Sequence, residues 1–359
     1  MGRVGIILQV ILEELTAPVV LAPLGGGPST PELAAAVSEA GGLGFLAAGY
    51  LSASALGERI RATRRLTDRA IGVNLFVPGA GPTEPGAYEA FLTRLKAWSA
   101  STGARLGDAR YSDDDWDAKL EVVLGERLPV ISFTFGCPDR VVVEVLQRAG
   151  SEVWVTVTAP EEAAQAQRAG ADALVVQGSE AGGHRASFVD RPELPLYGLL
   201  ALLALVVEQT ALPLVASGGI ATGRAIAAVL CAGAKAAQIG SAFMQCPEAG
   251  TSEVHRTALR SDTATAMTRA FTGRLARGIR NDFLDEHSAV APIAYPELHY
   301  ATAPMRAQAR EAQNAGLVNL WAGEAHALAR EAPAAELVRQ FVVDAKAASE
   351  ELARRLGGL

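Results

Sequence analysis

A short segment of the sequence combines an amide, two adjacent glycines and a histidine in an order suited to a ligand site. The segment reads Gln177-Gly178-Ser179-Glu180-Ala181-Gly182-Gly183-His184-Arg185. Gln177 closes an apolar run, the glycine pair leaves room for a ligand beside the backbone, and the imidazole of His184 titrates near neutral pH. This arrangement favours His184 as a residue that handles protons in a site over the alternative, a solvated loop histidine.

Two further glycine-containing turns predict a phosphate site. Ser217-Gly218-Gly219-Ile220 leads into a helix that Thr222 can cap, and Gln238-Ile239-Gly240-Ser241 ends another apolar run. The backbone N–H groups of Gly218, Gly219, Gly240 and Ser241 can donate to phosphate oxygens, and a helix N-terminus favours the negative charge. Ordinary tight turns are the alternative interpretation.

Two weaker signals stand nearer the N-terminus. The turn Ala22-Pro23-Leu24-Gly25-Gly26-Gly27 lets backbone amides approach a flat ligand, or it is simply a flexible turn. Asn74 lies in the apolar run Gly72-Val73-Asn74-Leu75-Phe76, where a carboxamide needs hydrogen-bond partners. It either binds the edge of a cofactor or braces a neighbouring strand.

These signals fall at the ends of short, near-continuous apolar runs, which are typical of buried parallel strands. Helical patterns alternate with the runs, and caps such as Thr30 before Pro31 mark helix starts. The succession predicts an α/β fold, a (β/α)8 TIM barrel whose site lies on the loops after the strands. An open doubly wound sheet is the alternative. The eight predicted strands are 19–23, 43–47, 71–76, 130–135, 153–158, 173–177, 213–217 and 236–240.

Two regions exceed the barrel module. Residues 78–129 contain two predicted helices, around 89–99 and 113–125, and the chain after Gly240 is largely helical without obvious further strands. We therefore expect a barrel over 1–245 and a helical segment over 246–330 that covers the barrel mouth and the substrate. Residues 331–359 should form a C-terminal helix, near 333–356, that packs on the barrel.

Composition restricts the class of protein. Half of the 359 residues are hydrophobic, which allows a large core, and the net charge of −7 argues against a nucleic-acid partner. The run at 5–12 resembles a signal peptide, but Glu13 and Glu14 follow it at once and no cleavage pattern is present. No apolar run is long enough to span a membrane. These features predict a cytoplasmic protein without a membrane partner.

The remaining cysteines and histidines give no metal-binding pattern. The three cysteines fit neither a disulfide framework nor a zinc site, although Cys137 follows a predicted strand, where a reactive role is an alternative. The other histidines have no acidic or cysteine partners at metal spacing, so surface or packing roles are expected for His255, His287, His299 and His326.

Together, the five motifs ending at Gly26, Phe76, Arg185, Ile220 and Ser241 resemble the nitronate monooxygenase (2-nitropropane dioxygenase) family, from Ala22 to about Arg330. The resemblance implies a barrel that holds FMN noncovalently, with His184 as the catalytic histidine. It implies oxidation of alkyl nitronates by O2 to carbonyl compounds and nitrite, and barrels of this kind are often homodimers. The cofactor-binding residues expected from the resemblance and the motifs are Pro23, Asn74, Gln177, Gly182, Gly218, Gly219, Gln238, Ile239, Gly240 and Ser241.

The resemblance leaves several points open. Tyr295 and Tyr300 are candidates for pocket-lining tyrosines, and the segment 274–292, rich in arginine, is either family-specific or a salt-bridged structural loop. A reductase that uses FMN and NAD(P)H, similar to flavin enoyl-acyl-carrier-protein reductases or quinone reductases, shares the Gly-Gly-His segment. A barrel without redox chemistry that binds a sugar phosphate is the third possibility.

Overall fold

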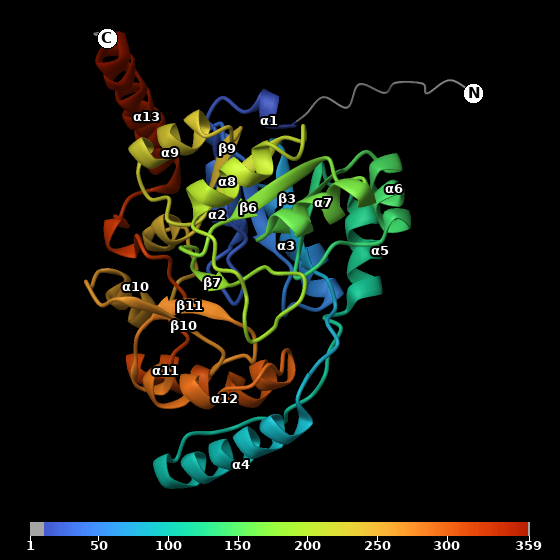
Figure 1. Ribbon diagram of the computed structural model, residues 1–359, viewed down its shortest axis with the longest axis vertical. Coiled ribbons are helices and arrows are strands. Elements are labelled where there is room, and N and C mark those ends of the chain that lie inside the picture. The colour runs from blue at the N-terminus through green and yellow to red at the C-terminus, as the bar shows by residue number, and fades with distance from the viewer. Residues whose placement is uncertain (1–10, 358–359) are drawn as a thin grey trace.

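The computed structural model describes residues 11–357, and eight parallel strands form its centre (Figure 1). Their order is β1-β9-β8-β6-β5-β4-β3-β2, and Leu43 closes the barrel because its N–H and C=O bond to Val19 and Leu21 of the first strand. The predicted (β/α)8 barrel is confirmed, and the open sheet is excluded. The strands are β1 (Val19–Leu21), β2 (Gly44–Ala47), β3 (Ile71–Phe76), β4 (Val130–Thr134), β5 (Glu152–Val157), β6 (Ala173–Gln177), β8 (Leu214–Ser217) and β9 (Ala236–Ile239).

The side chains inside the barrel change from apolar to polar along the strands. Successive residues of a strand face opposite sides, so residues two apart share the barrel interior. Phe45 and Trp154 fill the floor with their ring centroids 5.8 Å apart, and Gly72 makes room, because a Cβ there would lie 2.4 Å from the Phe45 ring. Two residues further along the strands, the side chains inside the barrel are polar. They belong to Asn74, Ser132, Thr156, Gln177, Ser217 and Gln238.

Helices surround the barrel, and two of them begin at the capping residues predicted for them, Thr30 and Thr222. The Thr30 hydroxyl accepts from Leu33 N–H, and the Thr222 hydroxyl accepts from Ala225 N–H, each satisfying an N-terminal amide of its helix. The helices outside the strands are α2 (Pro31–Glu39), α3 (Ala53–Arg64), α5 (Trp116–Glu126), α6 (Arg140–Arg148), α7 (Pro160–Ala169), α8 (Leu199–Val207) and α9 (Gly223–Cys231), while the short α1 (Ile11–Glu14) lies below the barrel floor.

The extension after the barrel folds back over the mouth and is not entirely helical. Strands β10 (Thr265–Thr268) and β11 (Ala276–Ile279) form an antiparallel hairpin, and β11 also pairs with β7 (Gly183–His184). The sequence pattern did not predict these strands because they are short and do not alternate cleanly between polar and apolar residues. The remaining elements are α10 (Glu253–Leu259), α11 (Asp282–His287), α12 (Glu297–Glu311) and the 3-10 turns η1 (Ser241–Gln245), η2 (Ser288–Val290), η3 (Ala315–Leu317) and η4 (His326–Leu328).

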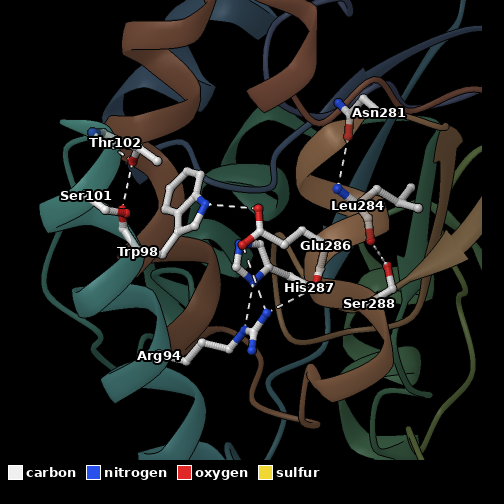
Figure 2. Close-up of polar contacts among 10 residues, drawn as sticks. Arg94, Trp98, Ser101, Thr102, Asn281, Leu284, Glu286, His287 and Ser288 are labelled. Carbon is white, nitrogen blue, oxygen red and sulfur yellow. Dashed lines mark hydrogen bonds and ion pairs between the residues drawn. The ribbon is translucent and has the colours of Figure 1, made fainter.

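One helix of the 78–129 insertion packs on the extension rather than on the barrel. Helix α4 (Pro85–Thr102) lies beside α11 and α12 (Figure 1), and its Phe91 and Leu95 share a core with the extension. Figure 2 shows Arg94 and Trp98 of α4 directed at α11, where the Trp98 indole N–H donates to the Glu286 carboxylate at 3.1 Å. The cap over the barrel is therefore built from two separate parts of the chain.

The C-terminal helix α13 (Ala334–Gly357) packs against α9 and α2, and its first half is buried through residues such as Phe341. The apolar run at 5–12 lies mostly outside the described residues, as do positions 358–359. Within residues 11–357, no helix has the length and apolar character needed to cross a bilayer.

Candidate functional site

A cavity of about 500 Å³ opens at the carboxyl ends of the barrel strands, beneath the extension. It is lined by the polar layer of the barrel and by residues of α12 and of the segment that follows it. Of the residues predicted from the sequence, ten line this cavity: Pro23, Asn74, Gln177, Gly182, His184, Gly218, Gly219, Gln238, Gly240 and Ser241. Ile239 does not line it, because strand alternation turns this side chain into the core outside the barrel.

His184 lies in the short strand β7 rather than in a flexible loop. Its neighbour Gly183 pairs with Arg277 and His184 itself with Ala276 of β11. Gln177 supports this strand from the barrel: its Nε2 donates to the His184 carbonyl at 3.1 Å, and its Oε1 accepts from Ala186 N–H at 2.9 Å. The Gln177 amide, expected to point at a ligand, therefore first positions the histidine.

The environment of the His184 ring keeps it neutral. Burial, together with the smaller effect of the charges of Arg274 and Arg306, lowers the pKa of His184 to about 3. Nε2 lies 2.9 Å from the Thr272 hydroxyl, whereas Nδ1 has no partner within residues 11–357. The Thr272 hydroxyl can donate its one proton either to Nε2 or to the Arg274 carbonyl at 3.3 Å, and in the second case it accepts from Nε2. It can therefore hold the ring in either neutral tautomer, and Nδ1 is left to interact with a ligand.

Asn74 braces its neighbouring strand and also lines the cavity. Its Nδ2 donates to the hydroxyls of Ser132 and Thr134, both at 2.9 Å. Its Oδ1 accepts no hydrogen bond from the part of the chain that the structure describes, so an acceptor remains in the cavity wall. Asn74 can therefore have both of the roles considered from the sequence, as a brace for the neighbouring strand and as a contact for a cofactor.

The two glycine turns present backbone amides without acceptors. No described residue accepts from the N–H groups of Gly218, Gly219, Gly240 or Ser241, although all four line the cavity. Gly218 and Gly219 have φ of 117° and 67°, a backbone region that favours glycine. Unpaired amides beside the start of α9 fit a phosphate group, as in other barrels of this architecture.

Four lining residues come from segments that gave no signal in the sequence. Tyr50 stacks on His299 with ring centroids 3.8 Å apart, Trp321 lies 5.5 Å from the His184 ring, and Arg306 is buried in the wall. Tyr295 contacts the edge of His184 at 5.7 Å but does not line the cavity. Tyr300, the second tyrosine candidate, also lies outside the lining.

Three of the other four histidines, for which surface or packing roles were expected, are buried at the wall of the cavity. His255, His299 and His326 line the cavity, because the folded-back extension brings α10, α12 and η4 to the barrel mouth. His287 has the expected packing role: it is fully buried in the cap core, where Arg94 Nε donates to its Nδ1 at 3.4 Å (Figure 2). No cluster of His, Cys, Asp or Glu suited to a metal occurs among residues 11–357.

The contacts of Cys137 and of the arginine-rich segment 274–292 bear on the alternative roles that the sequence left open for them. Cys137 does not line the cavity, and burial raises the pKa of its thiol to about 11, which disfavours the reactive thiolate. Arg277 forms an ion pair with Glu324 at 2.9 Å, which fits the salt-bridged interpretation. Arg274 instead lies buried with its guanidinium carbon 4.0 Å from the Phe135 ring centroid, beside His184.

The fold and the cavity define a (β/α)8-barrel enzyme with its ligand site at the carboxyl ends of the strands. The chain belongs to the nitronate monooxygenase family, whose sequence profile matches residues 10–344, and it is an oxidoreductase. It is 43% identical over 334 residues to a nitronate monooxygenase of Pseudomonas aeruginosa, covering 90% of this chain and 95% of that protein.

Two solved structures are similar to this chain over most of its length. A nitroalkane oxidase from Streptomyces ansochromogenes is 47% identical, with a TM-score of 0.92, over 95% of this chain and 99% of that one. FabK from Thermotoga maritima is 25% identical, with a TM-score of 0.74, over 96% of this chain and 97% of that one. The resemblance expected from the motifs is therefore confirmed at the level of the family.

Proposed function

We propose that this chain is an FMN-dependent nitronate monooxygenase that oxidises alkyl nitronates with O2 to carbonyl compounds and nitrite. The observation that carries the proposal is the neutral, buried His184 in a cavity that also presents unpaired backbone amides. Family membership supports the reaction type, and the cavity supports the cofactor.

The residues present fit FMN. The amides of Gly218, Gly219, Gly240 and Ser241 would hold the phosphate, and the Oδ1 of Asn74 would accept from the ring system. When bound, FMN supplies the redox chemistry that links nitronate oxidation to O2, and the protein orients the substrate against it.

His184 suits a substrate that is already an anion. An imidazole whose conjugate acid has a pKa near 3 is a poor base, so it is badly matched to the weakly acidic carbon of a neutral nitroalkane. As a neutral ring it can instead donate from Nδ1 to an oxygen of the nitronate when the Thr272 hydroxyl donates its proton to Nε2 rather than to the Arg274 carbonyl. The nearby charges of Arg274 and Arg306 favour the same anion.

The first experiment distinguishes the proposed nitronate monooxygenase from a reductase that uses FMN and NAD(P)H. The purified protein should show a flavin spectrum, and anaerobic mixing with propionate 3-nitronate should bleach it quickly. Bleaching by NADH without bleaching by nitronate would identify a reductase. A colourless protein that does not take up FMN would contradict both flavin functions.

The second experiment tests the histidine. We expect His184→Asn to lower nitronate turnover by about a hundredfold or more while FMN stays bound, in line with typical contributions of acid–base groups. The matched control is His287→Asn, because His287 is equally a buried histidine but lies in the cap core away from the cavity. Equal losses in both variants would mean that His184 is merely structural.

A further inference from the structure

Arg274 is a buried cation without a carboxylate partner, next to the proposed reaction centre. It is 6% exposed, and no carboxylate of residues 11–357 lies within 4.0 Å of its guanidinium group. The charge of Asp190 acts on Arg274 from further away, because that carboxylate forms a two-point ion pair with Arg269. A buried charge is costly unless its surroundings compensate for it, so the contacts that Arg274 does make are informative.

Two backbone carbonyls hold the guanidinium group in place. Arg274 Nε donates to the Arg185 carbonyl at 3.4 Å, and its Nη2 donates to the Ser187 carbonyl. Both carbonyls belong to the segment that directly follows His184 along the chain. Arg274 therefore joins the turn between β10 and β11 to the segment that carries the histidine.

The guanidinium group also lies over an aromatic ring. Its Cζ atom is 4.0 Å from the centroid of the Phe135 ring and 6.0 Å from that of Tyr295. A cation is attracted to the negative face of an aromatic ring, and the attraction is stronger where water is excluded. This contact compensates for part of the buried charge, and it fixes the Phe135 ring from one side.

Phe135 in turn contacts the histidine. The Phe135 ring and the His184 imidazole are nearly perpendicular, at 88°, with 5.6 Å between their centroids. Tyr295 contacts both rings, with centroids 5.3 Å from Phe135 and 5.7 Å from His184. Because the three rings are packed together, a shift of Phe135 would change the space that is open to the His184 ring.

The backbone of Phe135 is in an unfavourable conformation. Its φ is 74°, a region that residues with a side chain rarely adopt. Such a conformation persists only where the surrounding contacts determine it. The Phe76 ring packs on Phe135 with 4.5 Å between centroids, and Arg274 lies over its face. The strain indicates that the position of this ring matters in addition to its apolar character.

The turn that carries Arg274 contacts His184 at a second point. The Thr272 hydroxyl lies 2.9 Å from His184 Nε2, and it also accepts from the Arg274 N–H at 3.4 Å. The charge of Arg274 disfavours a proton on the imidazole, as does that of Arg306 from α12, where His299 is the titratable neighbour of His184. One turn thus restrains the ring at Nε2 and, through Phe135, on its side.

We propose that Arg274 is a positioning residue that fixes the His184 imidazole for the reaction by holding the Phe135 ring against it. The proposal deepens the proposed function and rests on it for the identity of the reaction. Arg274 does not line the cavity, so it acts on the geometry of the site through Phe135. An arginine suits this role because its planar group can stack on a ring while its N–H groups donate to carbonyls, which a lysine ammonium cannot do together.

Steady-state oxygen uptake by the holoenzyme with propionate 3-nitronate gives the first test. We expect Arg274→Met and Arg274→Lys each to lower kcat about tenfold, with a smaller change in KM, because a displaced catalytic group slows the reaction even when it is present. The control Arg277→Met removes a similarly buried arginine of the same hairpin, which pairs with Glu324, and it should keep its kcat. Native kcat in Arg274→Lys would overturn the positioning role, because charge alone would then suffice.

The His184→Asn background separates positioning from a general structural role. If Arg274 acts through the histidine, adding Arg274→Met to His184→Asn should leave the residual kcat unchanged. A further tenfold loss in the double variant would overturn the proposal. Phe135→Leu keeps the test valid if the Arg274 variants fail to fold, because it removes the ring but leaves the two carbonyl contacts of Arg274 in place. It should lower kcat about tenfold, and only when His184 is present.

Crystal structures of the variants give a measurement that does not depend on turnover. In Arg274→Met the Phe135 and His184 rings should be rotated or occupy two positions, whereas Arg277→Met should keep them as they are. Unmoved rings in Arg274→Met would overturn the positioning role even if turnover fell. Displaced rings in a protein whose native form does not turn over the nitronate would overturn the proposed function but keep the role of Arg274 in fixing His184.

Discussion

The Lys119 ammonium lies 2.7 Å from the Asp114 carboxylate, and this pair holds Tyr50 in the cavity wall. The other carboxylate oxygen of Asp114 accepts from the Tyr50 N–H at 2.8 Å. Tyr50 and Asp114 both have positive φ, 67° and 59°, which is unfavourable for residues with a side chain. The ion pair therefore stabilises a strained turn that aligns Tyr50 with His299.

Removing either partner of this ion pair should have unequal effects on stability. Asp114→Asn leaves the Lys119 ammonium, which is 1% exposed, without a counter-charge, and we expect a loss of about 3–5 kcal/mol in the free energy of unfolding. Lys119→Met should lose less than half as much, because Asp114 is partly exposed and keeps its bond to Tyr50 N–H. Urea denaturation measures both values, and equal losses would contradict the asymmetry.

The barrel was predictable because its signals are local. Each strand is a short apolar run, and caps such as Thr30 and Thr222 mark the helices independently of the rest of the chain. The polar layer could also have been found: Ser132 and Thr156 stand two residues after the floor residues Val130 and Trp154, and strand alternation places them inside.

The cap could not be predicted in the same way. Tyr50 follows β2, Arg306 lies in α12 and Trp321 follows η3, so these residues meet only through packing between distant segments. Their sequence surroundings are those of ordinary helices and turns. The same reason explains why His299 was expected to be a packing or surface residue.

The proposed phosphate site predicts a specific effect of a methyl group at Gly219. In Gly219→Ala the new Cβ would lie 3.1 Å from the Glu180 Cβ beside the unpaired amides, so we expect FMN affinity to fall at least tenfold. Gly103→Ala is the matched control: its φ of 73° resembles the 67° of Gly219, but no atom lies within 4 Å of the added Cβ. Both variants should lose about 1 kcal/mol of stability from the positive φ.

Flavin fluorescence during titration of the apoprotein measures this affinity. FMN affinity in Gly219→Ala that is unchanged from the native protein would place the phosphate elsewhere. Equal weakening in both would point to a general loss of stability instead.

Thr272 should be a positioning residue for His184. Thr272→Val removes the hydroxyl 2.9 Å from Nε2, so the ring loses the partner that lets Nδ1 carry the proton toward the nitronate. We expect kcat to fall about tenfold or more with FMN still bound, whereas the buried control Thr268→Val, in the β10 hairpin, should keep its kcat. Steady-state oxygen uptake gives both values, and an unchanged kcat in Thr272→Val would remove Thr272 from the mechanism.

Buried histidines should make the protein less stable in acid. Burial lowers the pKa of His255 in the folded state to about 4, below its ordinary value of 6.5. Since the unfolded chain then binds more protons between these values, the free energy of unfolding must fall as pH decreases through this range. For His255 alone the loss from pH 7.5 to pH 5 should be about 2 kcal/mol. His184, His287 and His299 shift in the same direction and add to the slope.

The variant His255→Gln isolates one of these contributions. Its side-chain amide can still donate to the Trp321 carbonyl, which now accepts from Nε2 at 3.0 Å, but it does not titrate. The difference in unfolding free energy between the two proteins should therefore shrink or reverse in favour of the variant on going from pH 7.5 to pH 5. Denaturant unfolding at both pH values measures this difference. A constant difference would show that His255 takes up a proton in the folded protein as readily as in the unfolded chain, against the effect expected from its burial.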